Sequence, residues 1–184
     1  MEVLLENVRL AFAQHIFEAG SINGSAPAFS SKAIFDEGSK AHKKLLAAEE
    51  KVAEEKWGAK GKATLDLIRK KGDSAVKDGD LKPEWDGFAG SLYANSSAKK
   101  RPTIIDRDQT PLAASDGKPY GGCIVNMMVD VWAQDNTFGK KINNTLTGLQ
   151  FVKDGDAFAA GAPAADASKF PTLAVEDDDD DLMN

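Results

Sequence analysis

The chain has 184 residues, of which 42% are hydrophobic and 28% are charged, with 23 Lys and Arg against 29 Asp and Glu. At roughly 100 to 200 residues per domain, this length predicts one domain with a short appendage. The sequence has no apolar run long enough to span a membrane, its N-terminus carries an early acid, and Cys123 is the only cysteine. These features predict a soluble, cytosolic protein without a signal peptide, membrane span or disulfide framework.

The negative charge is concentrated at the C-terminus. Six acids and no base lie in the last nine residues, and without them 23 acids balance 23 bases. Such a charge block cannot bury apolar surface and usually forms an interaction tail, the alternative being a solubility tag without a partner. An Ala-, Gly- and Pro-rich stretch precedes it. We therefore expect a folded domain (1–156), a flexible linker (157–175) and a disordered acidic tail (176–184).

Two strands are predicted at the start of the chain. The first covers residues 3–12 and is expected to turn one apolar row inward: Leu4, Val8, Leu10 and Phe12. The second covers residues 29–35, where Phe29, Ala33 and Phe35 alternate with Lys32 on the opposite side. Both patterns have the period of two that is typical of half-buried strands.

An amphipathic helix is predicted over residues 39–57. Its apolar residues recur at three- and four-residue spacing, with Lys and Glu on the other side. Ser39 is a suitable N-cap, and Gly58 a suitable C-terminal stop. A shorter helical segment is expected from residue 63 to 71.

Four more strands are predicted, at residues 91–94, 103–106, 123–132 and 143–152. The pattern is clearest in 123–132, whose apolar row consists of Cys123, Val125, Met127, Val129 and Val131. Strands interrupted by one helix, without a regular strand-helix alternation, predict a β-rich mixed α+β domain. The inventory fits an OB-fold-like five-stranded barrel with an inserted amphipathic helix.

The sequence contains no convincing catalytic, metal or cofactor motif. His15 and His42 are the only histidines and are interpreted as structural, and Cys123 as a small core residue. The Gly- and Lys-rich segment 58–64 lacks the glycine spacing and the Ser or Thr after Lys that a phosphate loop requires. We therefore predict a protein that is not an enzyme and needs no cofactor or metal, with a metal-dependent nuclease as a remote alternative.

Basic residues interleaved with aromatic ones indicate a different chemistry. Binding single-stranded nucleic acid requires cations for the phosphates and aromatic faces on which bases stack. The stretches 85–102 and 132–141 combine both. The first-choice contact residues are Tyr93, Lys99, Lys100, Arg101, Trp132, Phe138, Lys140 and Lys141; the second choices are Trp85, Phe88, Arg9 and Lys32. The competing interpretation places the aromatic residues in the core and the Lys and Arg residues on a solvated surface.

Several short blocks have the order and spacing of a known family. They are Asn7-Val8-Arg9-Leu10, Lys56-Trp57-Gly58, Gly87-Phe88 with Asn95, Arg101-Pro102, and the segments 122–126, 132–136 and 148–152. Together they cover about residues 3–156 and resemble the single-stranded DNA-binding proteins of tailed bacteriophages, long catalogued as a domain of unknown function. The resemblance implies an OB-fold domain that coats single-stranded DNA during phage replication, recombination or repair in the host cytoplasm.

The same resemblance gives the acidic tail a role. In such proteins a tail of this kind recruits replication or recombination proteins, and its carboxylates are expected to compete with DNA for a cationic groove. The tail residues are Glu176, Asp177, Asp178, Asp179, Asp180 and Asp181. The alternative function is a protein-protein adaptor that uses this tail as a recruitment peptide without binding nucleic acid. No membrane partner is expected, and the oligomeric state stays open.

Overall fold

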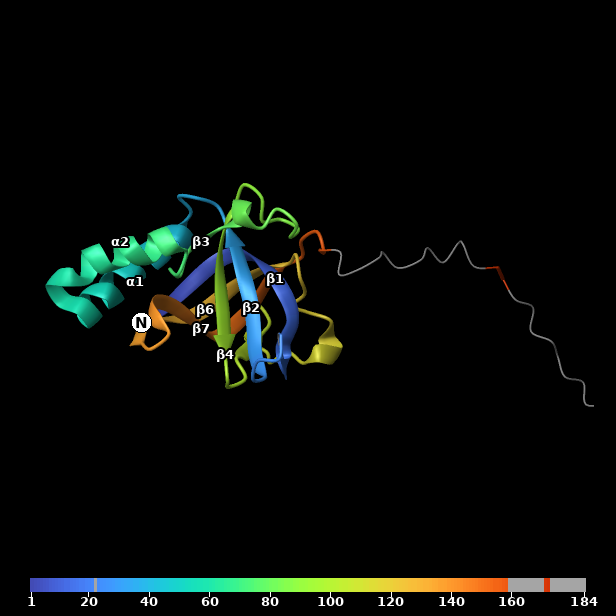
Figure 1. The fold of residues 1–184 in the computed structure, drawn as a ribbon. Coiled ribbons are helices and arrows are strands. Elements are labelled where there is room, and N and C mark those ends of the chain that lie inside the picture. The colour runs from blue at the N-terminus through green and yellow to red at the C-terminus, as the bar shows by residue number, and fades with distance from the viewer. Residues whose placement is uncertain (22, 159–170, 173–184) are drawn as a thin grey trace, which may run out of the picture.

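A β-barrel with two helices at one end forms the body of the protein (Figure 1). The computed structural model describes residues 1–21, 23–158 and 171–172. The strands are β1 (Glu2–Gly20), β2 (Ala28–Phe35), β3 (Lys77–Asp78), β4 (Leu92–Ala98), β5 (Thr103–Ile105), β6 (Ile124–Asn136) and β7 (Gly139–Lys153). The helices are α1 (Lys40–Trp57) and α2 (Gly61–Lys71), with short 3-10 turns at Gly58–Lys60, Gly79–Leu81 and Ala114–Asp116.

The sheet closes on itself. Its strand order is β3-β4-β2-β1-β6-β7-β5, and an additional parallel pairing of β4 with β7 joins Ser97 to Thr145. The closed ring therefore consists of β1, β2, β4, β6 and β7. This mixed five-stranded barrel, with helices inserted between β2 and β3, confirms the predicted OB-fold-like architecture.

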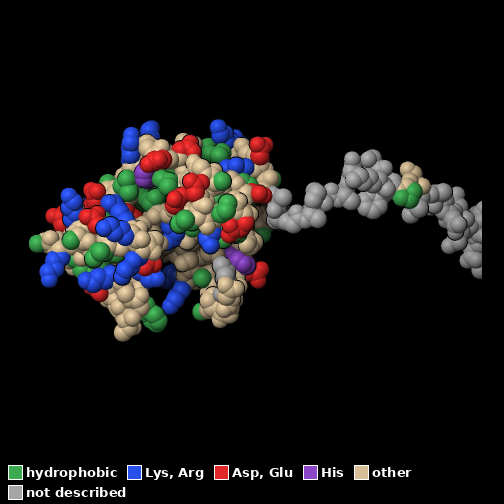
Figure 2. Space-filling view, turned by 45° about the horizontal axis from the view of Figure 1, so that its top comes forward, with side chains coloured by type: hydrophobic (Ala, Val, Ile, Leu, Met, Phe, Trp, Pro, Cys, Tyr) green, Lys and Arg blue, Asp and Glu red, His purple; other side chains and the backbone are tan. Residues whose placement is uncertain are grey.

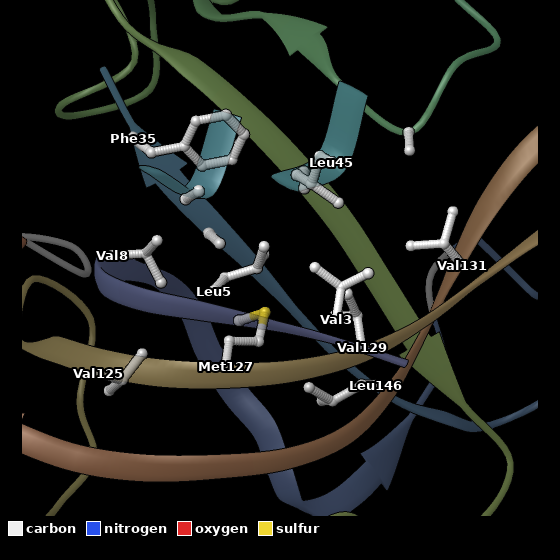
Figure 3. Close-up of a cluster of buried hydrophobic side chains, with 14 of the residues drawn as sticks. Val3, Leu5, Val8, Phe35, Leu45, Val125, Met127, Val129, Val131 and Leu146 are labelled. Carbon is white, nitrogen blue, oxygen red and sulfur yellow. The ribbon is translucent and has the colours of Figure 1, made fainter. Parts of the chain in front are cut away.

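The core fills the barrel and the space under α1. All five side chains of the apolar row predicted in 123–132 are buried, from Cys123, which precedes β6, to Val131. Figure 3 shows Met127 and Val129 of β6 together with Leu5 and Val3 of β1 and Leu45 of α1. Fully burying a side chain of this size contributes about 1.5 to 3 kcal/mol to folding. Helix α1 is thus held to the barrel through its apolar side.

The inward row of β1 differs from the prediction. Leu4 and Phe12 are 37% and 36% exposed, whereas Val3 and Leu5 are buried. The strand bulges, because Asn7 and Phe12 have positive φ angles of 53° and 55°, and its pairing with β6 shifts between Leu5 and Val8. A bulge inserts a residue and reverses the alternation. The prediction that Leu4 and Phe12 point inward is therefore wrong.

Both helices begin and end close to the predicted residues. The Oγ atom of Ser39 accepts a hydrogen bond from the backbone N–H of His42 at 3.3 Å, and α1 ends where Gly58 takes a φ of 57°. The predicted cap and stop are thereby confirmed. Helix α2 starts two residues earlier than expected and ends at Gly72, whose φ of 73° is left-handed.

Candidate nucleic-acid interface

A groove of about 970 Å³ runs over the barrel from β1 and β2 across β4 to β7. Its walls are the bulged part of β1, the segment 73–77 that follows α2, and the outward side chains of β6 and β7. Figure 2 shows two lobes that project at the lower edge of the molecule, with lysine and arginine side chains beside the hollow between them. The groove therefore combines segments that lie far apart in the sequence.

The groove is positively charged. Four lysines line it, namely Lys32, Lys77, Lys99 and Lys141, and Asp73 is the only acid among its lining residues. Asp73 pairs with Lys141, with Nζ and Oδ1 separated by 3.3 Å. Three lysines consequently have no acidic partner within the groove lining. Such an excess of one charge in a concave surface attracts an ion of the opposite sign.

Two of the four ammonium groups are partly dehydrated. Burial lowers the pKa of Lys32, and the neighbouring cations Lys77 and Lys82 lower it further. Burial also lowers the pKa of Lys77, while the nearby carboxylates of Asp73 and Glu49 oppose that shift. The charged forms of both lysines are therefore less stable here than in water.

Aromatic rings accompany these cations. Trp132 is 41% exposed, and its Nε1–H donates to Oγ1 of Thr145 at 3.1 Å, which fixes the edge of the indole and leaves a face available. Trp85 packs edge-on against Phe12, with ring centroids 4.9 Å apart. Fixed rings with accessible faces are suited to stacking on bases.

The structure brings five of the twelve sequence-predicted residues into this groove: Lys32, Trp85, Lys99, Trp132 and Lys141. Lys100 and Arg101 are exposed beside Lys99, and the Arg101 guanidinium lies 5.9 Å from the ring centroid of Phe17. These two residues extend the positive charge beyond the groove.

Two predicted residues lie at the turn between β6 and β7. Phe138 is 83% exposed and does not line the groove. The Nζ atom of Lys140 is 3.7 Å from a carboxylate oxygen of Asp135 and 5.5 Å from the ring centroid of Trp57. The hairpin tip thus carries one free ring and one cation that already has partners.

Three other predicted residues have packing roles. Phe88 and Tyr93 are buried, with 1% and 5% exposure, and their ring centroids are 4.9 Å apart in a cluster that also supports Trp85. The Nη2 atom of Arg9 donates to the carbonyl oxygen of Asp156 at 2.7 Å, and the guanidinium lies 4.1 Å from the ring centroid of Phe158. Arg9 therefore holds the segment that follows β7.

Phe12, His15 and Lys77 also line the groove and were not among the predicted contacts. Phe12 was assigned to the core because its position matches an uninterrupted alternation, and the bulge that reverses it leaves no clear mark in the sequence. His15 lies in the part of β1 beyond the predicted strand. Lys77 is in a two-residue strand too short for a pattern.

Within the described residues, no helix is long and apolar enough to cross a membrane. The same part of the chain has no group of three or more His, Cys, Asp or Glu side chains arranged to hold a metal ion.

Comparison with known proteins decides the family. The family described as "Enterobacter phage Enc34, ssDNA-binding protein" matches residues 1–183. The chain belongs to this family. Membership confirms the predicted resemblance and the class of non-enzymatic DNA-binding proteins. A protein named p50 of Acyrthosiphon pisum secondary endosymbiont phage 1 is 38% identical, with both chains covered in full.

Solved structures show the same fold. The single-stranded DNA-binding protein from bacteriophage Enc34, in complex with ssDNA, has a TM-score of 0.63 at 21% identity, covering 86% of this chain and 89% of that one. The single-stranded DNA-binding protein gp2.5 of bacteriophage T7 has a TM-score of 0.57 at 11% identity, covering 94% and 99%. At these identities the likeness concerns the fold.

Proposed function

We propose that this protein binds single-stranded DNA in the groove between β1, β2, β4 and β7, largely without regard to sequence. The observation that carries the proposal is the lining of that groove, in which four lysines face one acid and two tryptophans flank them. Family membership supports the same ligand. So does the barrel it shares with the Enc34 protein, which was solved in complex with ssDNA.

Different groove residues contact the phosphates and the nucleobases. Lys32, Lys77, Lys99 and Lys141 neutralise phosphates, and bases stack on Trp85 and Trp132. Stacking is tolerant of sequence because every base has a π-face, and each stacked base contributes about 1 to 3 kcal/mol. Lys100, Arg101 and Lys140 add longer-range attraction at the rim.

Fluorescence anisotropy with a labelled oligo-dT of about 25 nucleotides tests the binding. For three to four neutralised phosphates the salt slope is about −2 to −3, so affinity is expected to fall roughly 20- to 50-fold between about 50 and about 200 mM salt. Quenching of tryptophan fluorescence should accompany binding, since Trp132 is exposed in the groove. No binding at low salt would overturn the proposal and favour a protein-protein adaptor.

A protein of this kind coats and protects single strands. We place that activity in phage DNA replication, recombination or repair in the cytoplasm of the host cell. The division into a binding domain (1–156), a linker (157–175) and an acidic tail (176–184) belongs to the same proposal. The tail competes with DNA for the groove and, when displaced, recruits replication or recombination proteins. Its residues 176–181 lie outside the described part of the chain.

The path of the chain supports tail competition. Phe158 lines a second pocket of about 1070 Å³, and this pocket shares Phe12, Gln14 and Trp85 with the groove. The chain therefore leaves the barrel next to the groove. A flexible segment of the length that follows has an r.m.s. reach of about 30 Å, twice the radius of gyration of about 15 Å expected for such a body.

A further inference from the structure

The middle of the groove contains a lysine in an unusual setting. The Nζ atom of Lys32 lies 5.0 Å from the ring centroid of Phe12 and 5.3 Å from that of Trp85. The ammonium of Lys82 lies 5.0 Å from the same Trp85 ring. Two cations from separate segments thus converge on one indole. Lys77 also lines the groove and acts electrostatically on Lys32.

Among the described residues, no carboxylate forms a direct ion pair with this group. The side-chain ion pairs found among the described residues use Lys44, Arg69, Lys118, Lys140 and Lys141, and none of them uses Lys32, Lys77 or Lys82. Lys77 instead donates from Nζ to the carbonyl oxygen of Gly72 at 2.7 Å. Three ammonium groups without a direct ion pair among the described residues therefore act on one another, and carboxylates, those of Asp73 and Glu49, act only on Lys77 at longer range.

Such an arrangement costs free energy unless an anion joins it. A partly buried charge loses hydration, and like charges nearby raise the cost. Cation–π attraction to the aromatic rings offsets part of this free-energy cost. An anion placed among the three ammonium groups would offset part of their mutual repulsion and accept charge-assisted hydrogen bonds from them.

We propose that Lys32, together with Lys77 and Lys82, forms a phosphate-binding subsite that anchors one backbone phosphate of the single strand. The adjoining base then stacks on the Trp85 ring, which Phe12 and Phe88 hold edge-on from neighbouring positions. The inference rests on the proposed function and deepens it. It ranks the lysines of the groove, with Lys32 contributing more than the exposed Lys99.

The subsite makes binding depend on pH. The pKa of Lys32 is below its ordinary value in the free protein, and a bound phosphate raises it. Binding is therefore coupled to proton uptake, and affinity falls as pH rises through the lowered pKa, earlier than for an ordinary lysine. An arginine at this position stays charged throughout.

Other charged and titratable groups lie around Lys32 and also contribute to the pH dependence of binding. Lys77 of β3 and Lys82 of the following loop are cations, His15 of β1 and Lys99 after β4 line the groove, and Lys141 of β7 pairs with Asp73. Working between about pH 7.5 and about pH 9.5 stays above the range in which an ordinary histidine titrates. Oligo-dC is the probe, because cytosine has no proton to lose in that range.

The experiment compares the full chain with Lys32→Met, Lys32→Arg and a matched control, Lys62→Met on the exposed part of α2. Methionine keeps the length of the side chain and packs well against rings, so thermal unfolding should show no loss of stability. At about 100 mM salt, Lys32→Met is expected to weaken binding at least tenfold and to reduce the salt slope by about 0.7 to 1. Lys62→Met should change affinity less than about twofold.

The pH series provides the second readout. Lys32→Arg is expected to bind as tightly as the wild type near neutrality and to lose less affinity toward alkaline pH. Equal affinity of the two methionine variants, or identical pH profiles for the arginine variant and the wild type, would overturn the subsite while leaving DNA binding intact. Absence of binding by the wild type would overturn the proposed function itself.

Discussion

Single side chains differ in what their exposure allows them to do. Trp132 and Phe138 both lie on the β6–β7 hairpin, yet Trp132 lines the groove with 41% exposure and Phe138 projects from the turn with 83%. Phe88 and Tyr93 share the same aromatic character and are buried. The proposed stacking therefore falls on Trp132 and Trp85, which have both a fixed position and an accessible surface.

Replacing Trp132 with alanine should weaken DNA binding. Loss of one stacked base is expected to cost about 1 to 3 kcal/mol, or roughly 5- to 150-fold in the dissociation constant. Phe138→Ala is the matched control on the same hairpin and should have a clearly smaller effect. Anisotropy titrations of both variants measure the difference. Equal losses would move the stacking surface to the hairpin tip.

Besides the apolar packing of α1, one buried carboxylate links both helices to the segment before β3. Glu49 of α1 has 0% exposure. Its Oε2 atom accepts from Nε of Arg69 in α2 at 3.0 Å, and its Oε1 atom accepts from the backbone N–H of Val76 at 3.1 Å. Val76 directly precedes β3 and Lys77. This contact therefore sets the position of one wall of the groove.

Neutralising that carboxylate should destabilise the fold. Glu49→Gln keeps the shape but leaves Arg69 partly buried without a counter-ion. We expect a loss of about 1 to 3 kcal/mol in the free energy of unfolding, below the full cost of a completely buried pair because the Arg69 side chain is 32% exposed. Urea denaturation checks it, with the exposed neighbour Glu50→Gln as control. If both variants leave the free energy of unfolding unchanged, packing alone holds α2 in place.

At the scale of the whole molecule, charge is divided between a balanced body and an acidic C-terminus. A run of six acids within reach of a cationic groove imitates a run of phosphates. Under the proposed competition, either the tail or the DNA occupies the groove. Local tethering raises the effective concentration of the tail above that of any free peptide.

Deleting residues 176–184 should therefore tighten binding to oligo-dT. The gain is expected to be several-fold at about 50 mM salt and to shrink toward about 200 mM, because salt weakens the tail contact as well as the DNA contact. The truncated chain should accordingly show the steeper salt dependence. A variant with the six acids replaced by Ser, at full length, separates charge from length. Unchanged affinity of both variants at low salt would contradict competition.

Local patterns predicted most of the elements. The period-two rows of 29–35 and 123–132, the three- and four-residue spacing of 39–57, and the cap at Ser39 each reflect interactions between residues near in sequence. They failed where bulges intervened, at Leu4 and Phe12, because a bulge depends on how β1 pairs with its neighbours, here β6 near Leu4 and β2 near Phe12. Only some of the predicted contact residues line the groove, for a similar reason. An aromatic residue next to a Lys or Arg in the sequence can face either side of a sheet.

The sequence by itself determined the barrel class, the family blocks, the balanced body and the acidic C-terminus, since all of these follow from composition, periodicity and order along the chain. Only the tertiary structure decided which cations share a groove. Lys32 of β2 meets Trp85 and Lys82 because β4 pairs with β2 and because Trp85, in the segment between β3 and β4, packs against Phe12 of β1. Their convergence depends on long-range pairing and burial, and no local pattern contains that information.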